Sequence, residues 1–245
     1  MIKILAAIIC IQFVMTANAD DNRKLYAVGE AYHSVTKKLL YIEKHFSNIS
    51  TGELQEVLYT DIEQRQIAAK ELVIIPGAYG PGFVQFDNRT GQLVSVKPTR
   101  MAGTIEVVYR KSLKANEVRN TIESTSNMVI DSGFNTYIID HWDSLQAGTE
   151  LLVEFLVPAR MSSIKMTVKA TDCEEDVARC FSVVPDNFLV KLFAGEIELK
   201  YSADNQRLLM FRGLSNISNY SGGGQKVEIH YKYSSKFKFD QKKII

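Results

Sequence analysis

Apolar and polar residues alternate at every second position in several stretches of this 245-residue chain, and this pattern constrains the fold more than any other feature. In residues 226–233, Val227, Ile229 and Tyr231 alternate with charged or polar side chains. Because successive side chains of a β-strand point to opposite faces, such a stretch has one apolar and one hydrated face. That arrangement is typical of antiparallel sheets, since strands of parallel sheets are usually buried on both faces. The same pattern recurs in residues 104–110, 162–171 and 196–202.

Turn-forming residues separate many such short segments, for example Asn88 to Gly91 and Ser221 to Gly224. This spacing predicts a mainly β protein: an antiparallel meander that forms a barrel, a half-open barrel or a sandwich. No linker or shift of composition divides the chain, so we expect one domain over residues 20–245. The predicted strands are 25–33, 38–46, 54–60, 65–75, 83–87, 92–97, 104–110, 118–130, 150–157, 162–171, 180–184, 196–202, 206–212 and 226–233.

Two segments depart from the alternation and predict short helices that cover an open side or end of the sheet. The first is about 132–147, with Asp131 or Ser132 as the N-terminal cap and Gly148 at the end. The second is about 187–194. The apolar face of the first helix consists of Phe134, Tyr137, Ile138, His141, Trp142 and Leu145.

Residues 1–19 have the order of a cleavable signal peptide. Lys3 precedes an apolar stretch over residues 4–15, and Ala17 and Ala19 are the small residues that a signal peptidase reads. The apolar stretch is too short to span a bilayer. We therefore expect a periplasmic or otherwise secreted protein.

Charge and cysteine usage fit export. Without residues 1–19 the chain keeps 28 basic residues (29 minus Lys3) against 28 acidic ones, so it lacks the basic excess that nucleic-acid binding requires. Cys10 leaves with the leader, and Cys173 and Cys180 remain. In an oxidising compartment this pair predicts a structural disulfide, with two free thiols as the alternative. No redox C-x-x-C spacing and no further zinc ligands accompany the pair.

A series of short segments follows a characteristic order between about residues 129 and 217. The segments are Ile130-Asp131-Ser132-Gly133-Phe134, Trp142, Gly148, Phe155-Leu156-Val157-Pro158-Ala159-Arg160, Leu199-Lys200-Tyr201, Leu208 and Phe211-Arg212-Gly213-Leu214-Ser215-Asn216-Ile217, with Lys38 to His45 and Ala68-Ala69-Lys70 upstream. This order resembles a family of bacterial exported proteins without an assigned activity. The resemblance implies an extracytoplasmic β-rich fold and transfers no catalytic residue. At the level of fold, a curved sheet with a helix in its mouth is also similar to the lipoprotein carriers of the bacterial periplasm.

Motifs for catalysis are absent from the sequence, so we expect no enzyme, no catalytic residue, no metal and no cofactor. The four histidines (His33, His45, His141 and His230) have no metal-ligand spacing among them. The segment that begins at Gly213 lacks the second glycine of a G-x-S-x-G nucleophile motif.

The predicted helix supplies the candidate ligand-binding residues Phe134, Tyr137, Ile138 and Trp142. Facing a curved sheet, they would form an apolar pocket for a lipid or another apolar small molecule. Arg160 is the candidate at its rim, where it would orient an anionic group. The alternative for Arg160 is an ion pair with Asp131 or Asp143.

The segment from Lys232 to Lys243 is basic and contains Phe237 and Phe239. It predicts either peripheral contact with anionic lipid headgroups or a solvated, frayed end.

These patterns favour an exported, non-enzymatic envelope protein that binds a lipid or other apolar ligand in its curved sheet. The alternatives are a structural or assembly protein that docks an envelope protein, an outer-membrane β-barrel and, last, an unrecognised hydrolase. The observation that separates the first two is whether the sheet encloses an apolar cavity or a filled core.

Overall fold

The computed structural model describes residues 22–75, 77–187 and 195–234. Three predictions concern segments outside these residues: the cleaved leader, the second helix apart from Asn187, and the basic end of the chain beyond Ser234. No helix in the described part of the chain is long and apolar enough to cross a membrane.

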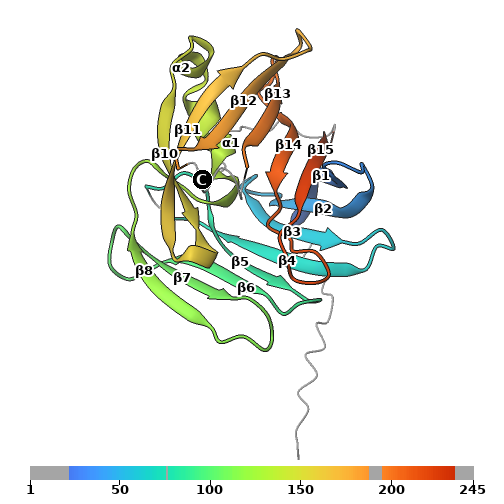
Figure 1. Cartoon of the computed structure of the whole chain (residues 1–245), viewed down its shortest axis with the longest axis vertical. Coiled ribbons are helices and arrows are strands. Elements are labelled where there is room, and N and C mark those ends of the chain that lie inside the picture. Colours follow the sequence, from blue (N-terminus) through green and yellow to red (C-terminus); the bar gives the residue numbers. More distant parts are fainter. Residues whose placement is uncertain (1–21, 76, 188–194, 235–245) are drawn as a thin grey trace, which may run out of the picture.

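Fifteen described strands form one sheet in the order β8-β7-β6-β5-β4-β3-β2-β1-β15-β14-β13-β12-β11-β10-β9 (Figure 1). All neighbours are antiparallel except β9 and β10. The sheet is strongly curved but open, because β8 and β9 are not paired with each other. The strands are β1 Arg23–His33, β2 Leu39–Asn48, β3 Leu54–Thr60, β4 Gln66–Val73, β5 Gly82–Asp87, β6 Leu93–Pro98, β7 Thr104–Arg110, β8 Val118–Glu123, β9 Met128–Val129, β10 Leu151–Val157, β11 Ser162–Thr171, β12 Ala178–Pro185, β13 Ile197–Ser202, β14 Leu208–Leu214 and β15 Lys226–Tyr233.

The predicted mainly β antiparallel meander is confirmed, and of the barrel, half-open barrel and sandwich the structure has the half-open form. One correction concerns the strands. The segment 118–130, predicted as one strand, forms β8 and β9 instead. A turn separates them, in which Met128 N donates to Thr125 O at 3.0 Å. Beyond this turn the chain pairs with β10 and no longer with β7.

β1 and β15 join the two halves of the meander. Their register runs from Ala27 opposite Tyr233 to His33 opposite Val227. Strands β1 to β8 therefore extend from one side of this pair and β15 to β9 from the other, as the blue and red strands of Figure 1 show.

In the structure the predicted helix 132–147 is divided into a 3-10 turn and two short helices that are separated by the single residue His141. A 3-10 turn, η1 (Asp131–Gly133), leads into α1 (Phe134–Asp140), and α2 (Trp142–Gln146) follows. His141 breaks the helix, because its φ of −110° and ψ of 18° are not helical, and its backbone N and ring Nδ1 both donate to Tyr137 O. Neither Asp131 nor Ser132 is a side-chain cap of α1. Gly148 follows α2 with a φ of +89°, as expected for a helix stop.

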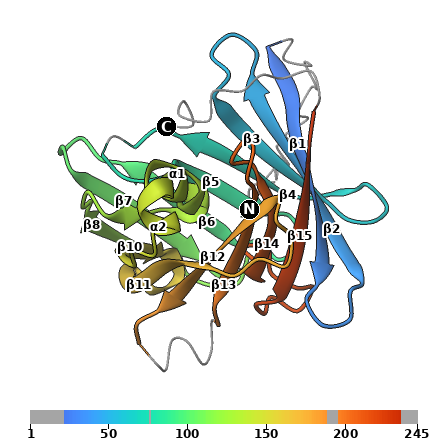
Figure 2. The ribbon, with the colours of Figure 1, turned by 90° about the horizontal axis from the view of Figure 1, so that it is seen from above.

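Three apolar clusters fill the concave side of the sheet. In the first, α1 and α2 pack on β10 to β13, at the end of the sheet that faces the viewer in Figure 2. The second joins β5, β6 and β7 to β9 and to Leu156 of β10. The third lies among β1 to β4 and β15, together with Ile217.

The two edges of the sheet differ in their surroundings. At β9, Met128 and Val129 are 1% and 0% exposed. The backbone of Tyr79 also pairs with this strand, because Tyr79 N donates to Met128 O at 2.9 Å and Ile130 N donates to Tyr79 O at 2.8 Å. At β8 every residue except Ile122 is exposed. The sheet is therefore rolled with one edge inside and one edge at the surface.

An ion pair between Lys70 of β4 and Asp131 of η1 links the two halves of the rolled sheet. Nζ of Lys70 lies 2.7 Å from Asp131 Oδ2, and Lys70 is only 3% exposed. Asn216, after β14, donates to Asp131 Oδ1 at 3.4 Å. Burial alone would raise the pKa of Asp131, but the charge of Lys70 and the hydrogen bonds from Lys70 and Asn216 outweigh it and lower that pKa.

We predict that Lys70→Met lowers the free energy of unfolding by about 3–5 kcal/mol, because it leaves the Asp131 carboxylate buried without its partner. Asn tolerates the positive φ of residue 131, so Lys70→Met/Asp131→Asn removes both charges without backbone strain. Urea titration followed by Trp142 fluorescence measures both variants. The double variant should be more stable than Lys70→Met, and equal or lower stability would contradict a buried ion pair.

Candidate functional site

The structure brings the four apolar binding candidates together within the core. Phe134, Tyr137 and Ile138 are 5%, 3% and 0% exposed. The ring of Phe134 stacks on Phe155 with centroids 4.8 Å apart, and Tyr137 lies edge-on to Tyr79 at 4.8 Å.

Trp142 is partly buried in the same cluster. Its ring lies 5.2 Å from that of Phe181 and 5.9 Å from that of Tyr201. The helix face therefore contacts protein side chains of β10, β12 and β13, as expected for a filled core.

Arg160 does not join this group. It is exposed at the end of the 3-10 turn η2 (Pro158–Arg160), which packs against β6 and β7. Asp131 is paired with Lys70, and neither Asp131 nor Asp143 forms an ion pair with Arg160 in the described structure.

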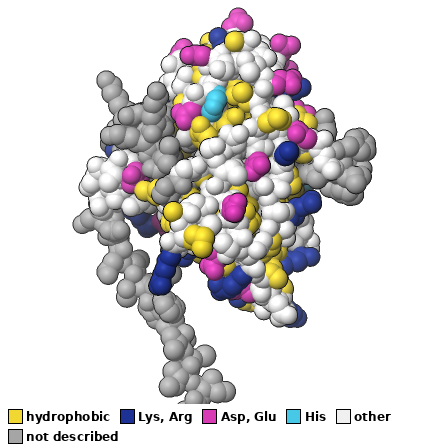
Figure 3. Space-filling view, turned by 90° about the vertical axis from the view of Figure 1, so that its left-hand side faces the viewer, with side chains coloured by type: hydrophobic (Ala, Val, Ile, Leu, Met, Phe, Trp, Pro, Cys, Tyr) yellow, Lys and Arg dark blue, Asp and Glu magenta, His cyan; other side chains and the backbone are white. Residues whose placement is uncertain are grey.

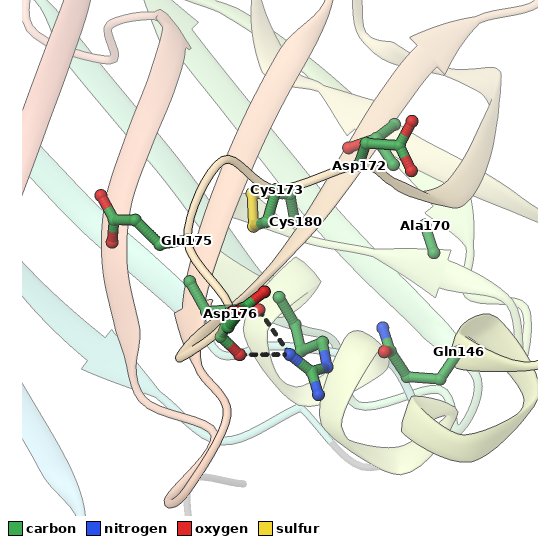
Figure 4. Close-up of a pocket in the computed structure, with 10 residues that line it drawn as sticks. Gln146, Ala170, Asp172, Cys173, Glu175, Asp176 and Cys180 are labelled. Atoms are coloured by element: carbon green, nitrogen blue, oxygen red, sulfur yellow. Dashed lines mark hydrogen bonds between the residues drawn. A yellow bond between two sulfur atoms is a disulfide. The ribbon is translucent and has the colours of Figure 1, made fainter.

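The predicted disulfide is confirmed. Cys173 and Cys180, with Cα atoms 5.4 Å apart, close the loop between β11 and β12. This loop borders a polar surface pocket of about 520 Å³ (Figure 4). The carboxylates of Asp172 and Glu175 point away from each other there, and Glu175 is paired with Lys200. No group of three or more His, Cys, Asp or Glu in the described residues could hold a metal ion.

A second pocket, of about 260 Å³, lies on the outer face of β13 to β15 beside Glu228. Glu228 is 8% exposed and accepts hydrogen bonds from Lys37, Arg212 and His230 at 2.6–3.0 Å. Burial would raise the pKa of Glu228, but these hydrogen bonds lower it from 4.5 to about 2. The cations beside this pocket are thus held by carboxylates of the same chain.

The strands β6 to β8 carry a different arrangement of charge, which we call the basic hairpin surface. Residues 97–119 contain six basic residues and only two acidic ones, Glu106 and Glu117. Arg119 is paired with both of these glutamates. The other five cations form no ion pair with any described residue: Lys97, Arg100, Arg110, Lys111 and Lys114.

Two exposed apolar side chains project from the turns at the ends of β7. Met101, in the β6–β7 turn, is 70% exposed and follows Arg100. Leu113, in the β7–β8 turn, is also 70% exposed and lies between Lys111 and Lys114 in sequence. Each tip therefore combines an apolar side chain with at least one basic neighbour.

Charges are unevenly distributed over the molecule. Residues 140–187 contain nine acidic residues and four basic ones, the reverse of the balance in residues 97–119. In Figure 3, Lys and Arg gather toward the lower part of the face in view, and Asp and Glu are more frequent in the upper part.

The basic hairpin surface is not apparent from the net charge of the whole chain, because acidic residues elsewhere cancel its excess of basic residues. The local excess between Lys97 and Arg119 is visible in the sequence and could have revealed it. The strand pairing was needed to show that β6, β7, β8 and the two turns between them form one exposed unit.

We expect the ion-pair network of Glu228 to make stability depend on pH. A carboxyl with a lower pKa in the folded than in the unfolded state stabilises the fold above its unfolded pKa, and this contribution is lost as the pH falls toward the folded pKa. Glu228→Gln should therefore cost at most about 3 kcal/mol at pH 7 and nothing near pH 2, with the change between pH 4.5 and 2. Urea titrations across this range measure it, and a difference that does not vary with pH would contradict the network.

Comparisons with known proteins give only distant similarity, and that to solved structures. No protein-family model matches the chain, and no curated protein is significantly similar to it. Among solved structures, it is similar to a β-barrel-like protein of a domain of unknown function, DUF1849, from Brucella abortus. The two share 12% sequence identity with a TM-score of 0.43, over 87% of this chain and 97% of that chain.

Proposed function

We propose that this is an exported, non-enzymatic envelope protein that docks peripherally on an anionic lipid surface through the basic hairpin surface. The observation that carries the proposal is the set of five cations that form no ion pair with a described residue, beside the exposed tips Met101 and Leu113. Anionic headgroups attract Lys and Arg, and the apolar tips can enter the boundary between headgroups and acyl chains.

The magnitudes are sufficient for reversible binding. Each Lys or Arg close to an anionic membrane contributes about 1 kcal/mol, so five contribute about 5 kcal/mol. Full burial of a Met or Leu side chain adds about 1.5–3 kcal/mol. These contributions must offset the loss of translational and rotational freedom, so we expect weak binding that falls with increasing salt.

The filled interior favours docking at the surface over a lipid held inside the curved sheet. Phe134, Tyr137 and Ile138 already contact side chains of the sheet and are at most 5% exposed. A lipid at this position would have to displace those contacts.

Native mass spectrometry of gently purified protein tests the interior directly. We expect the mass of the chain without a bound lipid, because α1 and α2 occupy the concave side of the sheet. A lipid retained at one copy per chain would instead support the carrier function and the pocket of Phe134, Tyr137, Ile138 and Trp142.

Co-sedimentation with vesicles tests the docking surface. We expect binding to phosphatidylglycerol-containing vesicles and not to pure phosphatidylcholine vesicles. Lys111→Glu/Lys114→Glu should weaken binding at least 10-fold, because about 1 kcal/mol is lost with each attraction and repulsion replaces it. Leu113→Ser should weaken it less.

Matched controls exist on strand β11 and on the loop between β11 and β12. Lys165→Glu/Lys169→Glu makes the same change of charge outside the basic hairpin surface, and Val177→Ser replaces an apolar side chain that is 69% exposed. Both controls should bind like the wild type. If the control variants lost as much vesicle binding as Lys111→Glu/Lys114→Glu, this surface would be excluded as the docking site. Equal binding to anionic and neutral vesicles would exclude it as well.

A further inference from the structure

We propose that the exposed β8 edge pairs with the β8 edge of a second copy of this chain, in an antiparallel register centred on Thr121. β8 hydrogen-bonds to β7 on one side only, and no other described strand covers its free side. The opposite edge of the sheet, β9, is buried, so β8 is the edge that a further strand can join.

Symmetry limits the registers available to such a pair. Two antiparallel strands that extend one sheet are related by a two-fold axis perpendicular to the sheet, which keeps the inner and outer faces of both copies on the same sides. Residues opposite each other must then face the same side of the sheet. This occurs only when the axis passes midway between the two copies of one residue, so that this residue lies opposite itself.

Charge selects one register among these. On the outer face of β8, Arg119, Thr121 and Glu123 alternate with inward-facing neighbours. Centring on Thr121 places Arg119 of each copy opposite Glu123 of the other, giving two equivalent cross-strand ion pairs. Centring on Arg119 would place that residue opposite itself, and centring on Asn120 would place Glu117 opposite Glu123.

The dimer would also enlarge the docking surface. Because the two-fold axis keeps the outer faces on one side, strands β6 to β8 of both copies would form one continuous six-stranded face. The basic hairpin surfaces of both copies would then meet the same membrane, and binding through two linked sites exceeds binding through one. This last consequence rests on the proposed function, whereas the pairing of β8 does not.

Sedimentation velocity without lipid tests the pairing. We expect a monomer–dimer equilibrium in wild-type protein. Glu123→Arg places Arg opposite Arg at both positions and should weaken dimerisation about 10-fold or more. Arg119→Glu should do the same, and Arg119→Glu/Glu123→Arg should restore the dimer because the charges are exchanged. Lys169→Glu, on β11 away from the edge, is the matched control and should dimerise like the wild type.

A cross-link tests the register. Thr121→Cys should form a disulfide-linked dimer on mild oxidation, because the two side chains meet at the axis. Ser95→Cys, on the outer face of β6, should not. A wild-type protein that stays monomeric at all concentrations would overturn the proposal, as would a dimer insensitive to Glu123→Arg or a double variant that fails to restore it. A dimer that does not bind vesicles would contradict the proposed function and leave the β8 pairing intact.

Discussion

The ion pair between Lys70 and Asp131 links the two halves of the rolled sheet at a buried position. Lys70 lies in the N-terminal half of the meander, and Asp131 lies between β9 and α1. Asn216 adds a third element to the same contact. A buried charge is stable only beside its partner, so the pair disfavours arrangements in which the two halves separate or slide.

Rolling makes the two edges of one sheet chemically different. β9 lies inside with Met128 and Val129 buried, and its backbone is bridged by Tyr79. β8 lies at the surface next to the basic residues of β6 and β7. Both the surface that we propose for lipid docking and the edge that we propose for self-association therefore follow from which edge the fold leaves outside.

The candidate site was only partly predictable from sequence. The one-sided apolar pattern of Phe134, Tyr137 and Ile138 correctly places them on one face of a helix, because periodicity reports which side chains share a face. It does not report whether that face borders a cavity or a neighbouring strand. Arg160 shows the same limit, because a position shortly after a strand does not determine which end of the molecule it occupies.

Local patterns were sufficient to predict the local structure: strands from alternation, turns from Gly and Asn, the helix region from its apolar face, and the disulfide from two remaining cysteines. These features depend on neighbours within a few residues or on a single pair. The division of segment 118–130 into β8 and β9 and the contact of Lys70 with Asp131 are visible only in the folded chain. Contacts between distant residues depend on the curvature and pairing of the whole sheet, which no local pattern encodes.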